Sequence, residues 1–217
     1  MTTATSSRQA LVFVAHGDDE SVGCGGYIPL LVERGYRVVL VIGSCARFQR
    51  KGQDVDNRAH TEAAATVLGI HEVHFLEMEE QRFESYRTME ITGELEALGL
   101  DPELILTHSG QDLNRDHRVI HEMALLYARP VIRRTRVLAC EVINNAEFHA
   151  DNFRANFYVD VTRTIEVKKK AFSCYVNEAR QFPHPYSEGA IEIKAHQRGM
   201  EAGLAFAEAY QVLRWFD

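Results

Sequence analysis

Short apolar runs alternate with amphipathic segments along the chain, and this alternation constrains the fold more than any other feature. The runs Leu11–Ala15, Arg37–Ile42 and Glu103–Thr107 are typical of buried strands, and segments with helical spacing of apolar residues follow them. Strands that alternate with helices predict a mainly parallel sheet with helices on both faces. We therefore expect an α/β, Rossmann-like single domain over residues 10–217, preceded by a disordered tail over residues 1–9.

The second half of the chain is expected to contain two late strands and two long helices. The strands are predicted at Val137–Ile143 and Asn156–Val161, and the helices at about Arg163–Arg180 and Ile191–Trp215. The proline-bearing segment Gln181–Gly189 lies between these helices and is the best candidate for a loop over a functional site.

Composition excludes several classes of function. The formal net charge is −7 and the longest basic run is three lysines, so we expect no nucleic-acid partner. No segment approaches the roughly 18 apolar residues that a membrane span needs. The four cysteines are widely spaced, as in reduced proteins. We expect a cytoplasmic protein with no membrane span, and a homo-oligomer is compatible with the sequence.

The first predicted strand ends in a polar cluster, His16-Gly17-Asp18-Asp19-Glu20. Ligands of α/β sheets bind outside the carboxyl ends of the strands, and neighbouring carboxylates repel one another unless a cation lies between them. His16 and Asp19 can reach one metal ion if the chain turns into a helix, and Gly17 permits a tight turn. Asp18 would then face the substrate as a general base. Alternatively, the acids only cap a helix and His16 is a hydrogen-bonded residue at the strand end.

A second polar cluster follows the strand that ends at Thr107. His117 is the best candidate for a third metal ligand, and Asp116 beside it is expected to orient an imidazole. Two histidines and one carboxylate with an open fourth position are typical of a hydrolytic zinc site. Three other side chains of this region compete for the third position: His108, Asp112 and His121.

These two clusters resemble the motifs of the PIG-L/LmbE family of zinc-dependent N-deacetylases. Residues Ala15–Glu20 are similar to the family's AHPDDE signature, with Gly17 in place of its proline. Residues Asp112–Arg118 resemble the family's second metal motif. The resemblance covers residues 11–175 and includes further matches at these positions: Gly23–Gly26, Arg58, Glu62, Asp160–Thr162 and Lys168.

The resemblance implies a function and a set of active-site residues. His16, Asp19 and His117 would hold Zn²⁺, and Asp18 would be the general base. The reaction implied is removal of an acetyl group from an N-acetylated amino sugar of the N-acetylglucosamine type, with release of acetate. The expected partner is therefore a small-molecule amino-sugar conjugate.

Other candidate residues have two interpretations each. Asn114 stands where several family members have a histidine, so it either donates a hydrogen bond to the oxyanion, without titrating, or fixes the turn before His117. Arg58 either donates to the oxyanion or forms a structural ion pair with Glu62. Aromatic residues around Phe182–Tyr186 either stack on a sugar ring or pack as a lid. Two further histidines are assigned to substrate binding or to shared proton transfer: His108 and His184.

Two other functions compete with sugar deacetylation. The first is a zinc amidohydrolase that acts on a non-sugar N-acyl substrate. The second is a non-catalytic module that binds a sugar nucleotide, suggested by the glycines of residues 23–26. The second is disfavoured because Asp18, Asp19 and Glu20 lie between the strand and these glycines and would repel a pyrophosphate.

Overall fold

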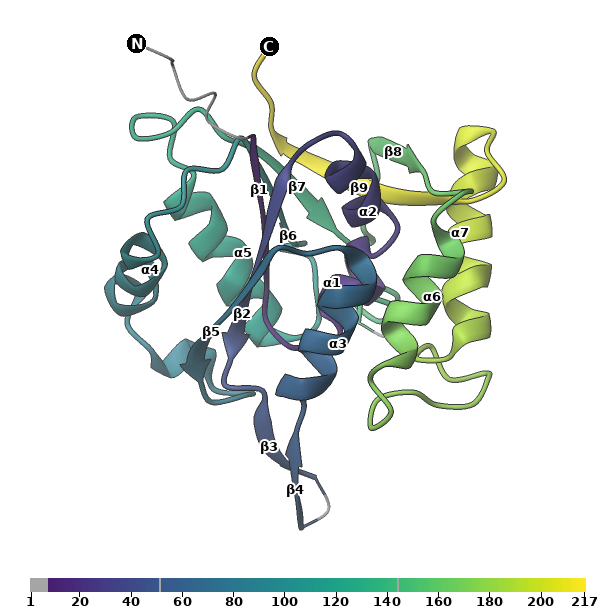
Figure 1. Ribbon diagram of the computed structural model, residues 1–217, viewed down its shortest axis with the longest axis horizontal. Coiled ribbons are helices and arrows are strands. Elements are labelled where there is room, and N and C mark those ends of the chain that lie inside the picture. The colour runs from purple at the N-terminus through teal and green to yellow at the C-terminus, as the bar shows by residue number, and fades with distance from the viewer. Residues whose placement is uncertain (1–7, 51, 144) are drawn as a thin grey trace.

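The computed structural model describes residues 8–50, 52–143 and 145–217, and in this part of the chain one seven-stranded sheet lies between layers of helices (Figure 1). The strand order is β5-β2-β1-β6-β7-β9-β8. The strands that pair in parallel are β1 (Gln9–Val14), β2 (Arg37–Ser44), β5 (Glu72–Met78), β6 (Leu104–His108) and β7 (Arg136–Cys140). Two more strands complete the sheet through antiparallel pairs: β8 (Phe157–Asp160) and β9 (Ala207–Arg214). The predicted α/β fold with a mainly parallel sheet is confirmed.

Helices cover both faces of the sheet because successive strand residues point into two apolar cores. The helices are α1 (Asp19–Cys24), α2 (Tyr27–Glu33), α3 (Arg58–Leu68), α4 (Thr88–Ala97), α5 (Arg115–Tyr127), α6 (Ile165–Ser173) and α7 (Glu188–Ala202). One core contains Val12 and Leu40 and is covered by α2, α3 and α6. The other contains Phe13 and Val41 and is covered by α4 and α5. In Figure 1 these two layers lie to the right and to the left of the sheet.

The carboxyl ends of β1 and β6 meet where the strand order reverses. From β1 the chain proceeds outward to β2 and β5, and then crosses back to β6 on the other side of β1. The connections after β1 and β6 therefore leave the sheet on opposite sides, and open α/β sheets bind their ligands in the crevice between such connections. Both polar clusters of the sequence begin at this crevice.

The helix predicted over residues 191–215 is wrong in its second half. Helix α7 ends at Ala202, and Gly203 follows with a φ of 71°, the left-handed conformation that commonly ends helices. The residues after it form β9, which fills the space between β7 and β8. The buried Glu208 of β9 accepts hydrogen bonds from two backbone N–H groups at the start of α2. Tertiary pairing thus decides the structure of this segment.

Other predicted elements differ in extent. After β2 the chain forms a hairpin, β3 (Arg47–Arg50) and β4 (Gln53–Asp56), which projects from the body of the molecule (Figure 1). Two short helices, α1 and α2, follow β1. Helix α6 ends at Ser173, short of the predicted end at Arg180.

Three sequence-based expectations concern the chain as a whole. The tail predicted over residues 1–9 lies outside the described residues up to position 7, and Gln9 begins β1. Within the described chain, no helix has both the length and the apolar character needed to cross a membrane. All four cysteines are free thiols.

Candidate active site

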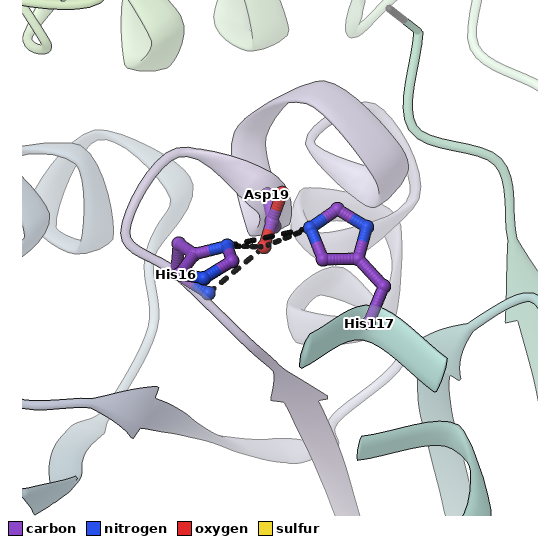
Figure 2. A group of neighbouring side chains, drawn as sticks. All are labelled: His16, Asp19 and His117. Carbon is purple, nitrogen blue, oxygen red and sulfur yellow. Dashed lines mark hydrogen bonds and ion pairs between the residues drawn. The ribbon is translucent and has the colours of Figure 1, made fainter. Parts of the chain in front are cut away.

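Three side chains bring metal-binding atoms together at the ends of β1 and β6 (Figure 2). His16 follows β1, Asp19 begins α1, and His117 lies in the first turn of α5. The Oδ2 atom of Asp19 is 3.5 Å from His16 Nδ1 and 3.4 Å from His117 Nε2, and these two nitrogens are 3.3 Å apart. All three residues were predicted as ligands, and the structure brings them into one group that could hold a metal ion.

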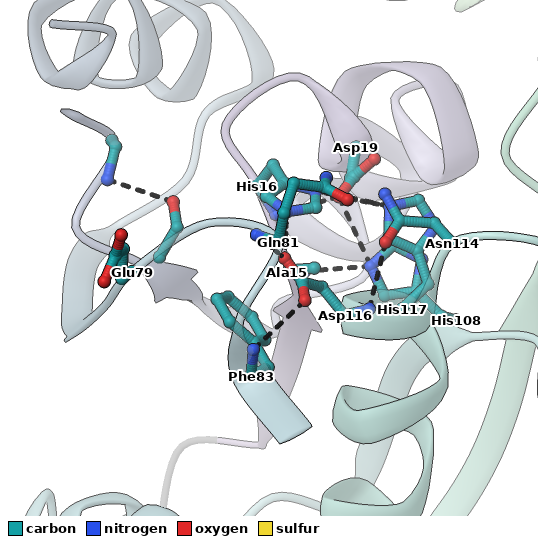
Figure 3. Close-up of polar contacts among 12 residues, drawn as sticks. Ala15, His16, Asp19, Glu79, Gln81, Phe83, His108, Asn114, Asp116 and His117 are labelled. Carbon is teal, nitrogen blue, oxygen red and sulfur yellow. Dashed lines mark hydrogen bonds and ion pairs between the residues drawn. The ribbon is translucent and has the colours of Figure 1, made fainter. Parts of the chain in front are cut away.

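A carboxylate lies behind each imidazole and determines which nitrogen faces the group. Figure 3 shows one of these pairs, His16 and Asp116. Asp116 Oδ2 is 3.0 Å from His16 Nε2, and Asp112 Oδ2 is 2.9 Å from His117 Nδ1. Because an ionised carboxylate only accepts hydrogen bonds, these outer nitrogens carry protons. The inner nitrogens of both imidazoles then present lone pairs to Asp19. Asp116 therefore orients an imidazole as predicted, but that imidazole belongs to His16.

The inward-facing atoms need a positive charge between them, since two nitrogen lone pairs and a carboxylate oxygen repel one another. Burial opposes the charged form of His16, but hydrogen bonds with Asp116 and Asp19 raise its pKa well above the usual value. Two imidazoles and one carboxylate oxygen, each imidazole supported by a second carboxylate, form a donor set that fits Zn²⁺.

The turn between His16 and Asp19 depends on an unusual backbone. A Cβ atom at Gly17 would clash with Thr61 Oγ1, so only glycine fits there. The left-handed conformation occurs one residue later, at Asp18, whose φ is 112°. Such conformations cost about 1–3 kcal/mol and are concentrated at functional sites. The turn holds Asp19 inward and leaves Asp18 at the wall of a cleft.

This cleft has a volume of about 160 Å³ and lies beside the metal-binding group. Its lining includes Asp18, Asn57, Asn114 and Tyr186 together with His16. The side chain of Asp18 accepts no hydrogen bond within the described chain, although the residue is only 6% exposed. Burial, with the negative charges of Asp19 and Glu178, raises the pKa of Asp18 well above its usual range. A carboxyl group in this setting is suited to accept a proton near neutral pH.

Asn114 is the N-cap residue of α5. Its side-chain oxygen accepts a hydrogen bond from the Asp116 backbone N–H at 2.9 Å, and its own N–H donates to Asp112 Oδ1 at 2.8 Å. The predicted role in the turn before His117 therefore has direct structural support. Asn114 also lines the cleft, where its amide nitrogen can still donate a hydrogen bond.

Arg58 is not among the residues that line the cleft. Its guanidinium group pairs with Glu77 of β5, donates to the Cys45 carbonyl at 3.0 Å and lies over the ring of Phe75. The structural interpretation of Arg58 is thus the better one, although its acidic partner is Glu77 and not the Glu62 suggested by the sequence.

The two histidines assigned to substrate binding do not line the cleft either. His108 is fully buried, accepts a hydrogen bond from the Ala15 N–H at 2.8 Å, and stacks on His117 with 3.9 Å between ring centroids. Burial and the nearby His117 lower the pKa of His108 to about 4. His184 is exposed, and its Nδ1 accepts a hydrogen bond from the Tyr186 N–H. His108 thus supports the metal-binding group by packing behind His117.

The sequence reasoning missed several residues that complete the site. The Tyr175 hydroxyl donates to Glu20 Oε1 at 2.9 Å, and Glu178 accepts a hydrogen bond from Asn57 Nδ2 at 3.2 Å. Tyr186 lines the cleft, and its hydroxyl has no hydrogen-bond partner in the described chain. Tyr175, Asn57 and Glu178 carry no metal-binding pattern, whereas Tyr186 belongs to the aromatic segment Phe182–Tyr186 that the sequence analysis offered as sugar-stacking or lid residues.

Comparisons with known proteins identify the family and the fold of the chain. Residues 11–128 match the model of the PIG-L family, which is described as GlcNAc-PI de-N-acetylase. The chain belongs to the PIG-L family. The matched segment contains both polar clusters and all three residues of the metal-binding group. None of the curated proteins compared matches the chain.

Several solved structures share the fold of this PIG-L protein. The 4-carboxy-2-hydroxymuconate hydratase of Pseudomonas putida KT2440 has a TM-score of 0.79 and 23% identity over 97% of this chain and 98% of its own. The N,N'-diacetylchitobiose deacetylase of Pyrococcus horikoshii has a TM-score of 0.75 and 17% identity, with coverage of 96% and 84%. A deacetylase of teicoplanin biosynthesis has a TM-score of 0.74 and 14% identity, with coverage of 93% and 96%. One fold therefore supports both deacetylases and a hydratase.

Proposed function

We propose that the protein is a zinc-dependent hydrolase that removes the acetyl group from an N-acetylated amino sugar and releases acetate. The observation that carries this proposal is the convergence of His16, Asp19 and His117 beside a cleft whose wall contains the buried carboxyl group of Asp18. Membership of the PIG-L family and the deacetylases among the similar structures support hydrolysis of an amide on a sugar-type substrate.

Asp18 is the general base in this proposal. Bound Zn²⁺ would supply a Lewis acid that polarises the acetyl carbonyl and lowers the pKa of water. Asp18 lies at the cleft wall next to the metal-binding group, and its raised pKa suits it to take a proton from the attacking water. The same carboxyl group then returns the proton to the leaving amine, so Asp18 acts first as base and then as acid.

Asn114 and Tyr186 are the donors available to the oxyanion. The oxygen of Asn114 is used by the helix cap, which leaves its amide N–H₂ for the substrate. Burial and nearby carboxylates raise the pKa of Tyr186 well above its usual value, so its hydroxyl stays protonated and can donate. Tyr186 thus takes the oxyanion-donor role for which the sequence suggested Arg58.

Acetate release from a panel of N-acetylated sugars and N-acyl amino acids tests this proposal. We expect release from sugars by protein that contains Zn²⁺, loss of activity after chelation, and recovery after Zn²⁺ is added back. Activity of protein free of metal would contradict the role of zinc. Hydrolysis of only the N-acyl amino acids would favour the amidohydrolase that the sequence also suggests.

A hydratase is the second candidate function. A structure with a TM-score of 0.79 belongs to a hydratase, and that likeness shows the fold alone. A base beside a metal-binding group can activate water for addition to a C=C bond as well as for attack on an amide. Addition of water to an unsaturated dicarboxylic acid, with no acetate released from any sugar, would favour this candidate.

A further inference from the structure

Glu20 is the third acid of the first polar cluster and is fully buried, yet it neither belongs to the metal-binding group nor lines the cleft. We infer that Glu20 and Tyr175 form a positioning pair, which holds the turn at Asp18 in the conformation that presents its carboxyl group to the cleft. This inference rests on the proposed role of Asp18 as the general base, and it adds two residues on which that role depends.

The backbone at Asp18 has to be held in place. Its φ of 112° and ψ of −31° lie in a region that residues with a Cβ atom rarely adopt. Asp18 occupies the N-cap position of α1, but its side chain makes no capping hydrogen bond. A carboxylate that capped the helix would be turned away from the cleft. Other groups must therefore stabilise this conformation.

Glu20 supplies one of these groups. Its Oε2 atom accepts a hydrogen bond from the Asp18 backbone N–H at 3.1 Å. Its Oε1 atom accepts hydrogen bonds from the hydroxyl groups of Ser21 at 2.6 Å and of Tyr175 at 2.9 Å. Because Glu20 and Tyr175 are both fully buried, the low local dielectric strengthens these hydrogen bonds. The carboxylate thus links the turn to a side chain from a distant part of the chain.

Tyr175 also contacts the turn directly. It follows α6, which packs against α1 and α3 (Figure 1). A Cβ atom at Gly17 would lie 3.4 Å from Tyr175 Cε1 and would clash with Thr61 Oγ1, so the turn lies close against both side chains. Tyr175 therefore supports the turn with its ring and, through Glu20, with its hydroxyl group.

The pair acts on the general base and leaves the metal-binding group to other contacts. Asp19 accepts a hydrogen bond from the His16 backbone N–H at 2.8 Å and faces the two imidazoles. Within the described chain, the side chains of Glu20 and Tyr175 bond to the Asp18 backbone, to Ser21 and to each other. Loss of the pair should therefore displace Asp18 while the metal ligands stay in place.

A purely structural role for Glu20 is the alternative. Glu20 lies in the first turn of α1, where a carboxylate stabilises a helix. That role predicts lower stability and no specific effect on turnover. The positioning role predicts a loss of kcat at unchanged zinc content, because a misplacement of about 1 Å can cost about 10²-fold in rate.

Two substitutions at Glu20 separate its hydrogen bond from its charge. Glu20→Met fills similar space without an acceptor, so we expect kcat to fall roughly 10–100-fold at full zinc occupancy, with KM within about twofold of the parent. Glu20→Gln is neutral but keeps an acceptor for the Asp18 N–H, and its kcat should stay within a few-fold of the parent. Equal losses in the two variants would show that the charge matters and would overturn the positioning role.

Tyr175→Phe tests the second member of the pair, and Tyr127→Phe is its matched control. Each removes a buried hydroxyl group that donates a hydrogen bond, to Glu20 in the first case and to the Leu100 carbonyl at 2.6 Å in the second. Both should lower stability to urea by a similar amount. Only Tyr175→Phe should also lower kcat, by roughly tenfold. Unchanged kcat in Tyr175→Phe, or an equal loss in Tyr127→Phe, would contradict the inference.

Amide hydrogen exchange at Asp18 separates this inference from the proposed function, because it needs no substrate. The Asp18 N–H should exchange slowly in the parent and in Glu20→Gln, and roughly tenfold faster or more in Glu20→Met and Tyr175→Phe. If the rates change in this way but the parent hydrolyses no N-acetylated sugar, the deacetylase function is wrong and the hold of the pair on the turn is supported. Equal exchange in the parent and in Glu20→Met would overturn the inference whatever the activity.

Discussion

The floor of the active site and the walls of its cleft are built in different ways. The floor consists of His16, Asp19 and His117, which lie on the ends of adjacent parallel strands and on the helices that follow, with carboxylates behind both imidazoles. The walls come from peripheral segments, namely the β3–β4 hairpin, the turn after β5 and the loop that contains Tyr186. The contrast suggests that the sheet fixes the chemistry and that loops set the specificity.

Asp18→Asn is expected to have the largest effect on rate. Asp18 lines the cleft beside the metal-binding group and is the proposed general base. Loss of the general base should lower kcat roughly 10²–10⁴-fold, and the isosteric amide should leave the fold intact. Steady-state acetate release by equal amounts of metal-loaded protein measures this. Activity within a few-fold of the parent chain would remove Asp18 from the mechanism.

Asp112→Asn tests whether the carboxylate behind His117 supports metal binding in the floor of the site. The amide can no longer hold the imidazole of His117 as an ionised carboxylate does, so Zn²⁺ affinity should fall roughly 10–100-fold. Asp116→Asn should act similarly through His16. Competition with a zinc chelator gives the affinities. Asp54→Asn, at an exposed position of β4, is the control that should leave them unchanged.

Tyr186→Phe tests the wall. The phenyl ring keeps the contact with Phe172, whose centroid is 5.9 Å away, but cannot donate a hydrogen bond. We expect kcat to fall roughly tenfold or more while zinc content stays the same, because one oxyanion donor is lost. His184→Ala on the same loop should change kcat little. Equal losses in the two variants would mean that the loop, and not the hydroxyl, matters.

Asn114→Ala should have the smallest effect that can still be measured. Loss of an N-cap side chain costs about 1 kcal/mol of stability, which urea unfolding can resolve. Asn114→Asp keeps an acceptor at the cap and should retain stability. A fall in kcat at full zinc occupancy in both variants would show that the amide N–H₂ also contacts the oxyanion.

The sequence predicts the floor well because its residues occur in two dense clusters that follow recognisable strands. It predicts less well which carboxylate supports which imidazole. Asp116 is adjacent to His117, but successive helix residues point about 100° apart, so Asp116 turns to His16 across the crevice. Asp112 comes from the preceding loop and folds back onto His117. The three-dimensional arrangement therefore decides which carboxylate supports which imidazole.

The walls and the end of the chain could not be predicted because they depend on distant contacts. Strand β9 has helix-compatible composition, and its structure follows from Gly203 and from pairing with β7 and β8. Glu80 and Glu178 are separated by about a hundred residues and carry no motif. Their convergence on Asp18 is visible only once the loops are in place.

Zinc content of Asp19→Ala and Asp18→Asn tests the central claim most directly. Both substitutions remove one carboxylate from neighbouring positions, yet only Asp19 faces the two imidazole nitrogens. Elemental analysis of proteins purified without added metal should find about one Zn²⁺ per chain in the parent and in Asp18→Asn, and little in Asp19→Ala. Zinc retained by Asp19→Ala and lost from Asp18→Asn would contradict the assignment of floor and wall.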